Sequence, residues 1–288
     1  GGQVCDLIAG ECVDVDDGGT DVPLEPEPDA GPGSDGGRPD ADRAPTGVEP
    51  DGGTVRKLYF AVVGDTRPPG SNDTNHYPTA IITKIYDQLE ALSPRPQFVV
   101  ATGDYQFAAP GGNQGELQIQ KYLTARDNYS GTVFASMGNH ECGSGGVTGN
   151  CAGSNSNNYQ SYLNHLVKPL GKTNPNYMVR IDDPDGKWTA KLIIVACNSW
   201  TAANKTWLTS VIAQPTTYTF LARHEPLGTD APCGADMDAL LRTHPYTLLM
   251  VGHIHKYSHS GRQLLEGVGG APLTGAANYG YATVEQLA

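Results

Sequence analysis

Four short apolar runs in this sequence each end in a glycine, and side chains able to bind a metal or carry a proton follow. Runs of this kind, with helix-length segments between them, are typical of buried parallel strands. In open α/β sheets ligands bind beyond the carboxyl ends of the strands, so we expect the side chains after the glycines to converge. These side chains belong to Asp65, Asp104, Asn139, His140, His253 and His255.

The mixture of carboxylate, amide and imidazole groups favours a transition metal, either Fe, Mn or Zn, over an all-oxygen magnesium or calcium site. Asp104 stands at a strand end and is well placed to bridge two ions. Two ions about 3.5–4 Å apart can hold a phosphoryl oxygen and lower the pKa of bound water towards about 7. We therefore expect hydrolysis by a metal-activated water, without a protein nucleophile.

The segments around these runs predict an α/β fold. Residues 79–92 place Ile81, Ile82, Ile85 and Leu89 on one helical face, and with strands on either side they form a βαβ unit. Later strands are more closely spaced, which predicts two packed mixed sheets with helices outside. The further strands are expected at 133–137, 178–181, 192–197, 219–222, 263–266 and 281–284, and the further helices at 116–126, 159–167, 205–213 and 236–243.

Residues 1–54 differ from the rest in composition. They contain fourteen acidic residues against two arginines, no aromatic residue and nineteen Gly or Pro. This segment has too little apolar surface to offset the entropy of ordering it, so we expect an irregular acidic arm or linker before a domain at 55–288. Acidic and basic residues balance in that domain, which disfavours a nucleic-acid partner. No apolar stretch approaches the roughly 18 residues of a membrane span.

Part of the acidic segment resembles a calcium-binding loop. Asp14, Asp16, Gly19 and Glu25 fall at positions one, three, six and twelve of such a loop. Gly18 and Pro23 do not fit this pattern, so we favour a solvated tether over a calcium site. The arm could also dock on a second copy of the chain and form a homo-oligomer.

Six cysteines at short spacings suit an oxidising compartment. Local pairing would join Cys5 to Cys12, Cys142 to Cys151 and Cys197 to Cys233, and the alternative is unpaired structural thiols. Metal binding by these cysteines is disfavoured because no CxxC pair occurs. We therefore expect an extracellular, periplasmic or cell-surface protein, with any export signal already removed before Gly1.

In order and spacing, the motifs resemble the calcineurin-like metallophosphoesterases, which include the purple acid phosphatases. The resemblance covers about residues 58–255 and adds His224 to the residues already named. It implies a four-layer αββα sandwich around two metal ions, and a phosphate ester as substrate. One ion would be held by Asp65, Asp104 and His255, the other by Asp104, Asn139, His224 and His253, and His140 would protonate the leaving group or stabilise the transition state.

Two positions depart from this family. Arg67 stands where the family usually has a histidine ligand, and Phe107 stands where purple acid phosphatases have a tyrosine ligand. The first ion could then be weakly held, gain a replacement ligand such as Tyr105 or His76, or belong to a site without turnover. Arg67 could grip the substrate phosphate, because a guanidinium matches phosphate oxygens, or form a salt bridge to Asp65. Glu141 is expected to orient a ligand instead of binding metal.

Two functions follow from these observations. The first is an exported metal-dependent phosphoesterase that acts on phosphomonoesters or small phosphodiesters. The second is a structural or assembly subunit with a degenerate metal site, which uses residues 1–54 for subunit contacts. Measured metal content together with turnover of a phosphate ester separates the two.

Overall fold

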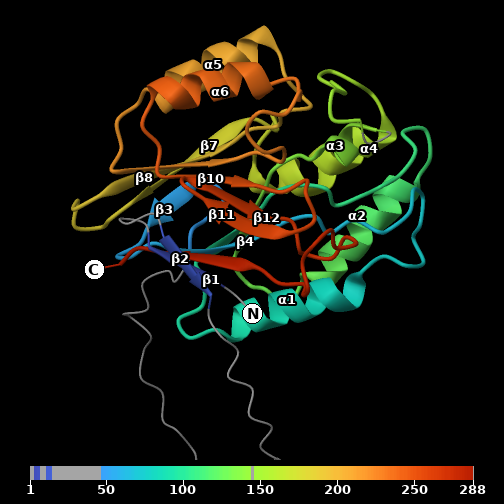
Figure 1. Cartoon of the computed structure of the whole chain (residues 1–288), viewed down its shortest axis with the longest axis horizontal. Coiled ribbons are helices and arrows are strands. Elements are labelled where there is room, and N and C mark those ends of the chain that lie inside the picture. Colours follow the sequence, from blue (N-terminus) through green and yellow to red (C-terminus); the bar gives the residue numbers. More distant parts are fainter. Residues whose placement is uncertain (1–2, 7–10, 15–46, 144–145, 288) are drawn as a thin grey trace, which may run out of the picture.

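Two mixed β-sheets lie face to face, and helices cover the outer face of each (Figure 1). The computed structural model describes residues 3–6, 11–14, 47–143 and 146–287. Two sheets between two layers of helices are the predicted four-layer αββα arrangement, which is confirmed.

The first sheet has six strands in the order β2-β1-β13-β4-β5-β6. Strands β4, β5 and β6 are parallel, and β13 pairs antiparallel with β4. The carboxyl ends of three successive strands therefore meet at one edge. The strands are β1 (Gln3–Asp6), β2 (Glu11–Asp14), β4 (Tyr59–Val63), β5 (Phe98–Ala101), β6 (Thr132–Ala135) and β13 (Ala282–Glu285).

The second sheet has seven strands in the order β11-β12-β10-β9-β8-β7-β3. Strands β8, β9, β10 and β12 are parallel. The carboxyl ends of β9 and β10 therefore lie at the same edge of this sheet. The strands are β3 (Gly52–Thr54), β7 (Tyr177–Asp182), β8 (Thr189–Ile194), β9 (Tyr218–Ala222), β10 (Leu248–Val251), β11 (Tyr257–Ser260) and β12 (Gln263–Glu266).

The helices complete the outer layers. Helices α1 (Thr79–Ala91), α2 (Gln114–Ala125) and α4 (Asn157–Tyr162) cover the first sheet, and α5 (Ala202–Ile212) and α6 (Gly234–Thr243) cover the second. The short helix α3 (Asn139–Cys142) follows β6 directly, and α4 continues into a π-helical turn (Leu163–Val167) and a 3-10 turn (Lys168–Leu170). The apolar face predicted for residues 79–92 is the face that α1 buries.

Stacked aromatic rings fill the layer between the two sheets. The rings of Phe60 and Phe98 lie 4.7 Å apart, and Phe220 from the opposite sheet meets Phe60 edge-on at 5.2 Å. Phe134 meets Phe98 edge-on at 5.6 Å. Such contacts add to the stabilisation from burial alone and fix how the two sheets face each other.

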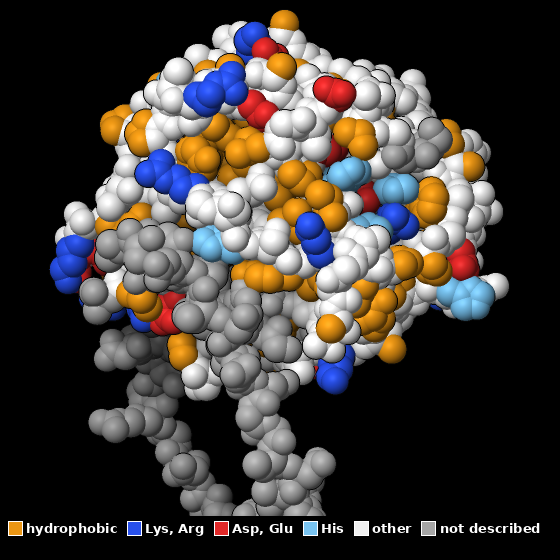
Figure 2. All heavy atoms as spheres, viewed as in Figure 1, with side chains coloured by type: hydrophobic (Ala, Val, Ile, Leu, Met, Phe, Trp, Pro, Cys, Tyr) orange, Lys and Arg blue, Asp and Glu red, His pale blue; other side chains and the backbone are white. Residues whose placement is uncertain are grey.

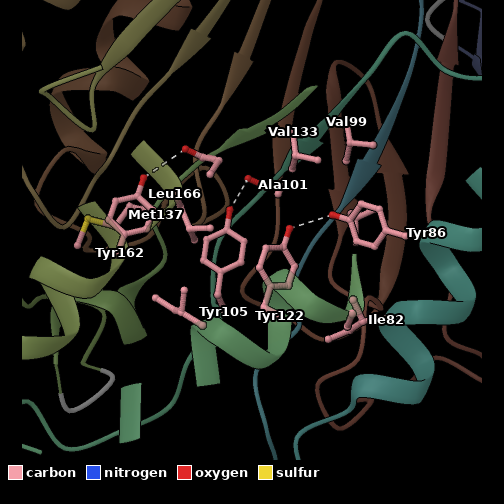
Figure 3. Close-up of a cluster of buried hydrophobic side chains, with 14 of the residues drawn as sticks. Ile82, Tyr86, Val99, Ala101, Tyr105, Tyr122, Val133, Met137, Tyr162 and Leu166 are labelled. Atoms are coloured by element: carbon pink, nitrogen blue, oxygen red, sulfur yellow. Dashed lines mark hydrogen bonds between the residues drawn. The ribbon is translucent and has the colours of Figure 1, made fainter. Parts of the chain in front are cut away.

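A row of buried tyrosines lies between the first sheet and its helices (Figure 3). The hydroxyl groups of Tyr86 and Tyr122 are 2.9 Å apart, and Tyr162 donates to the carbonyl oxygen of Ala135 at 3.2 Å. Tyr105 donates to the carbonyl oxygens of Ala101 and Ser136. Because these hydroxyl groups are hydrogen-bonded, burying the rings carries only a small desolvation penalty. The tyrosines also link the helices to the ends of β5 and β6.

The described parts of residues 1–54 join the sheets. Strand β1 pairs with β13, β3 pairs with β7, and Val48 is buried in the core between the sheets. The predicted arm is thus attached to the domain at both of its ends, and its division from the domain at residue 54 stays a prediction. The expected calcium loop and a docking segment fall mostly at 15–46, outside the described residues.

The cysteine predictions have mixed outcomes. Cys197 and Cys233 form a disulfide, as predicted. The predicted bridge between Cys142 and Cys151 is wrong, because both are free thiols that donate to the carbonyl oxygen of Asn198, at 3.6 and 3.3 Å. Cys5 stands opposite Cys12 where β1 pairs with β2, but their side chains lie outside what is described.

One buried carboxylate holds together the turns that follow β5 and β6. Glu141 Oε2 accepts hydrogen bonds from the backbone N–H groups of Asp104 at 2.9 Å and Gly138 at 2.7 Å. Its Oε1 accepts from the N–H of Tyr105 at 2.9 Å and of Gln106 at 3.3 Å. The predicted role of Glu141, orientation instead of metal binding, agrees with these contacts.

We predict that Glu141→Gln lowers the free energy of unfolding by about 2–4 kcal/mol, because the amide group would face backbone donors and leave them unpaired. Urea unfolding at neutral pH measures this change. Glu49→Gln, at an exposed position, is the matched control and should change the unfolding free energy by less than about 0.5 kcal/mol. Equal stability of the two variants would contradict this role of Glu141.

Candidate active site

The predicted site residues all follow strand ends at one edge of the two sheets. Asp65 follows β4, Asp104 follows β5, and Asn139 and His140 open α3 just after β6. The second sheet contributes residues beyond two of its own strands, and these are His224, His253 and His255. The structure therefore brings together residues that are up to 190 positions apart in the sequence.

The backbone at three of these residues is in the left-handed region. The φ angles are 56° at Asp65, 60° at Asp104 and 72° at His253. Residues other than glycine seldom adopt such angles, and strain of this kind is often found at functional sites. The strain turns each side chain sharply away from its strand towards the shared edge.

The glycines beside these residues allow the turns to approach one another. A Cβ atom on Gly138 would lie 2.2 Å from Asp104 Oδ1, and one on Gly252 would lie 2.4 Å from Asp65 Oδ2. No larger residue fits at either position without displacing a site carboxylate. The repeated glycine in the sequence thus has a steric cause.

The side chains converge tightly. His224 Nε2 lies 3.3 Å from Asp104 Oδ1 and 4.0 Å from Asp65 Oδ1, while His255 Nε2 lies 3.5 Å from Asp65 Oδ1. Beside them, His253 Nδ1 lies 3.0 Å from the side-chain oxygen of Asn139. Histidine, acidic and basic side chains gather over α3 on the face shown in Figure 2.

Backbone carbonyls set which ring nitrogens face the site. His224 Nδ1 lies 3.0 Å from the carbonyl oxygen of Thr102, and His255 Nδ1 lies 2.7 Å from that of Pro272. A carbonyl only accepts, so each Nδ1 carries a proton and Nε2 is the ring nitrogen that faces the site. This is the outer hydrogen bond that orients metal-binding histidines.

The donor set fits a cation. Ligand atoms of Asp65, Asp104 and His224 all lie within 4.8 Å of one another, and all three residues are buried. Asp65 Oδ1 and His224 Nε2 have no hydrogen-bond partner among the described residues. Buried polar atoms are normally paired, so these two atoms fit a site that binds a cation. The set as a whole, with Asn139 and His253 beside it, suits a transition metal.

The pKa values of the buried residues also indicate a site for a cation. Burial raises the pKa of Asp65 to about 7, although His224 opposes the shift. Burial alone would lower the pKa of His224, but Asp104 and Asp65 outweigh it and raise the value to about 10. The site therefore carries buried negative charge that attracts a cation or a proton.

His140 lies at the rim of this cluster. Its Nε2 is 3.7 Å from Asp104 Oδ2, and its ring packs edge-on against Phe107 at 4.3 Å. Burial lowers the pKa of His140 to about 4, although Asp104 opposes the shift. Burial therefore favours the neutral imidazole, which keeps one N–H group that can donate a hydrogen bond to a ligand.

Arg67 reaches the cluster from the loop after β4. Its Nε lies 3.5 Å from Asp104 Oδ2, its Nη2 lies 3.4 Å from His255 Nε2, and its Nη1 donates to the carbonyl oxygen of Pro68 at 3.1 Å. The alternative of a salt bridge to Asp65 is not the arrangement seen, since Asp104 is the carboxylate nearest to the guanidinium.

The suggested replacement ligands lie elsewhere. Tyr105 is buried among the tyrosines of the first sheet, where its hydroxyl donates to two backbone carbonyls. His76 is exposed and pairs with Asp73 at 2.9 Å. Neither side chain is available to the cluster, so the expectation of a replacement ligand from these two residues is wrong.

Sequence reasoning missed two buried carboxylates near the cluster. Glu225 follows His224, and Glu266 ends β12. Burial raises the pKa of both, and Asp104 and Asp65 add to the increase at Glu225 and Glu266, respectively. The one available signal was the adjacency of Glu225 to His224, since nothing near Glu266 in the sequence marks it.

Comparisons with known proteins agree with the geometry. The family model described as calcineurin-like phosphoesterase matches residues 58–257. A dimetal phosphatase from Danio rerio is similar in structure, with a TM-score of 0.50 and 16% identity, over 75% of this chain and 89% of that chain. A search of curated proteins gave no match.

A second similar structure is the protein described as the anchor in the inner membrane complex of Plasmodium. It has a TM-score of 0.57 and 12% identity, over 80% of this chain and 81% of that chain. At such low identities these likenesses concern the fold alone. The family match spans well over half of the sequence and contains every residue of the cluster, so this chain belongs to the calcineurin-like phosphoesterase family.

Proposed function

We propose that this protein is a metal-dependent phosphoesterase that hydrolyses phosphomonoesters or small phosphodiesters. The observation that carries the proposal is the convergence of Asp65, Asp104 and His224 into a buried set of ligand atoms with unpartnered positions. Asn139 and His253 extend this set, with 3.0 Å between their facing atoms. Family membership supports the same reaction class.

Metal ions bound by these residues would lower the pKa of water and polarise the phosphoryl group. Asp104 offers one oxygen towards His224 and the other towards Arg67 and His140, so it links the ligands to the groups beside the substrate. The hydrogen bonds from His224 and His255 to backbone carbonyls hold both imidazoles in the tautomer that can bind metal.

His140 and Arg67 are the residues we assign to the substrate. Both pack against Phe107, His140 at 4.3 Å and Arg67 at 4.8 Å, so both lie beside the same part of the site. The guanidinium would bring positive charge to the phosphoryl oxygens. The N–H group of His140 would stabilise the leaving oxygen in the transition state by a hydrogen bond.

We predict turnover of p-nitrophenyl phosphate or bis(p-nitrophenyl) phosphate after loading with Mn, Zn or Fe, and its loss after chelation. His253→Ala should lower kcat by at least about 100-fold, because a metal ligand is lost. His140→Ala should lower kcat by about 10²–10³-fold, because a hydrogen-bond donor to the leaving oxygen is lost. Steady-state assays of the loaded proteins measure these changes.

His76→Ala is the matched control, since His76 is exposed and pairs only with neighbouring residues of its own loop. It should keep the activity of the unchanged protein. Turnover that survives chelation, or that is equal in His253→Ala and the unchanged protein, would contradict the proposed chemistry.

A structural or assembly role is the second candidate. It is favoured by Arg67, whose guanidinium contacts two of the residues expected to hold an ion. The similar structure from Plasmodium, described as an anchor in the inner membrane complex, is a precedent for such a role on this fold. In this case the loaded protein would bind little metal and turn over neither ester.

We also propose that the protein is exported to an oxidising compartment, where the acidic segment could act as a tether. The disulfide between Cys197 and Cys233 supports this, because such bonds persist outside the reducing cytosol. Among the described residues, none of the helices has the length and apolar character needed to span a bilayer.

For protein recovered from a periplasmic or secreted fraction, we predict that Cys197 and Cys233 resist alkylation under denaturing conditions until a reductant is added. Peptide mass spectrometry measures this. Reduction should lower stability by about 3–4 kcal/mol, because the bond closes a loop with a sequence separation of 36. Alkylation of both cysteines without reductant would contradict the assignment.

A further inference from the structure

We propose that Arg67 replaces one of the two metal ions of the family, so that this chain holds a single ion beside a fixed guanidinium charge. The inference rests on the proposed function and makes it more specific. It concerns Asp65, Asp104 and His255, the residues expected to hold the first ion.

The guanidinium is fixed by contacts on several sides. It donates to the carbonyl oxygen of Pro68 at 3.1 Å, approaches Asp104 Oδ2 at 3.5 Å, and lies over the ring of Phe107 at 4.8 Å. Only 14% of the Arg67 side chain is exposed. A side chain held in this way acts as part of the site and not as a mobile surface group.

Arg67 also uses the atom that His255 would offer to an ion. The Nδ1–H group of His255 donates to the carbonyl oxygen of Pro272, so the lone pair of the ring is on Nε2. Nη2 of Arg67 lies 3.4 Å from this Nε2, and a guanidinium can only donate. The lone pair therefore accepts a hydrogen bond where the family places a metal.

The two side-chain oxygens of Asp104 face different groups, and His140 Nε2 also lies 3.7 Å from Oδ2. Asp104 Oδ1 faces His224 Nε2 at 3.3 Å, while its Oδ2 faces Arg67 Nε at 3.5 Å. In a two-metal site this carboxylate would bridge both ions. Here one oxygen faces the ligand set and the other faces a permanent positive charge, which would repel a second cation.

The two departures from the family contact each other. Phe107 has no atom that can bind a metal, and its ring lies against the guanidinium of Arg67. A ring face attracts a cation, so Phe107 stabilises Arg67 in this position. By comparison with either branch of the family the first ion lacks one ligand, and the arginine held on the aromatic ring supplies positive charge at that place.

The other ion keeps its whole ligand set. Asn139 and His253 have facing atoms 3.0 Å apart, and His224 Nε2 lies 3.3 Å from Asp104 Oδ1 without a hydrogen bond among the described residues. The contacts of Arg67 described above are with Pro68, Asp104, His255 and Phe107. One ion can therefore bind as in the family, with the guanidinium as the second positive centre.

Metal content tests the inference without reference to activity. The full chain is incubated with excess Mn²⁺ and, separately, Zn²⁺, then desalted and analysed by mass spectrometry for metal per chain. We expect about one equivalent for the unchanged protein and about two for Arg67→His and for Arg67→His combined with Phe107→Tyr. With Mn²⁺, electron paramagnetic resonance should show an isolated ion in the unchanged protein and a coupled pair in these variants.

Two controls separate the causes of a changed metal content. Arg67→Gln removes the charge without adding an imidazole and should bind a second equivalent at least about tenfold more weakly than Arg67→His. Arg180→His introduces a histidine at an exposed position on β7 and should leave one equivalent. If Arg67→His does not fold, as judged by circular dichroism, the metal count and resonance spectrum of the unchanged protein still decide the question.

The outcomes distinguish this inference from the proposed function. Two tightly bound equivalents and a coupled pair in the unchanged protein would overturn the inference and leave a phosphoesterase. One equivalent in both the unchanged protein and a folded Arg67→His would also overturn it, since the guanidinium would not be what excludes the ion. Absence of any bound metal would overturn both, whereas one equivalent without ester turnover would overturn only the proposed function.

Discussion

Buried negative charge at one edge of the sheets is the constraint on which the rest of the site depends. Asp65, Asp104 and Glu141 are all buried there, and Glu225 and Glu266 lie close by. Isolated buried carboxylates are strongly unfavourable, so each needs hydrogen bonds, a cation or a proton. Glu141 is satisfied by backbone N–H groups, while Asp104 shares its oxygens among His224, Arg67 and His140. Asp65 Oδ1 has no hydrogen bond among the described residues, and it lies 3.5 Å from His255 Nε2 and 4.0 Å from His224 Nε2.

The fold satisfies this constraint by building the site from strand ends that have little freedom. Left-handed backbone at Asp65, Asp104 and His253 aims the side chains inward, and glycines leave room for neighbouring turns. The aromatic core between the sheets and the tyrosine row under the first sheet hold those strand ends in place. Strain at the site is therefore supported by packing on both sides of the first sheet, which keeps the ligand atoms close together before any ion arrives.

Arg67 changes what such a rigid site can hold. A metal ion and a guanidinium both bring positive charge to a phosphoryl group, but only the ion can acidify water. In the proposed arrangement two groups supply these functions. An ion bound by His224 and His253 would acidify the water, and the guanidinium would supply the fixed charge beside His255. Phe107 is consistent with this arrangement, because it offers no ligand atom, whereas a tyrosine hydroxyl at that position would favour an ion where the guanidinium now lies.

Local periodicity in the sequence predicted most of the strands and helices after residue 55, and glycines at strand ends marked the candidate site residues except His224 and Arg67, which the resemblance to the family added. The helix over residues 79–92 and the runs before Asp65 and Asp104 are examples. Contacts between distant segments were decided only by the tertiary structure. Neither the hydrogen bond from Arg67 to His255 nor the free thiol of Cys142 follows from spacing, and β1 enters the first sheet from a segment whose composition predicts an irregular arm. Local sequence patterns indicate which side chains follow the strand ends, whereas the packing of the two sheets decides which of these side chains contact each other.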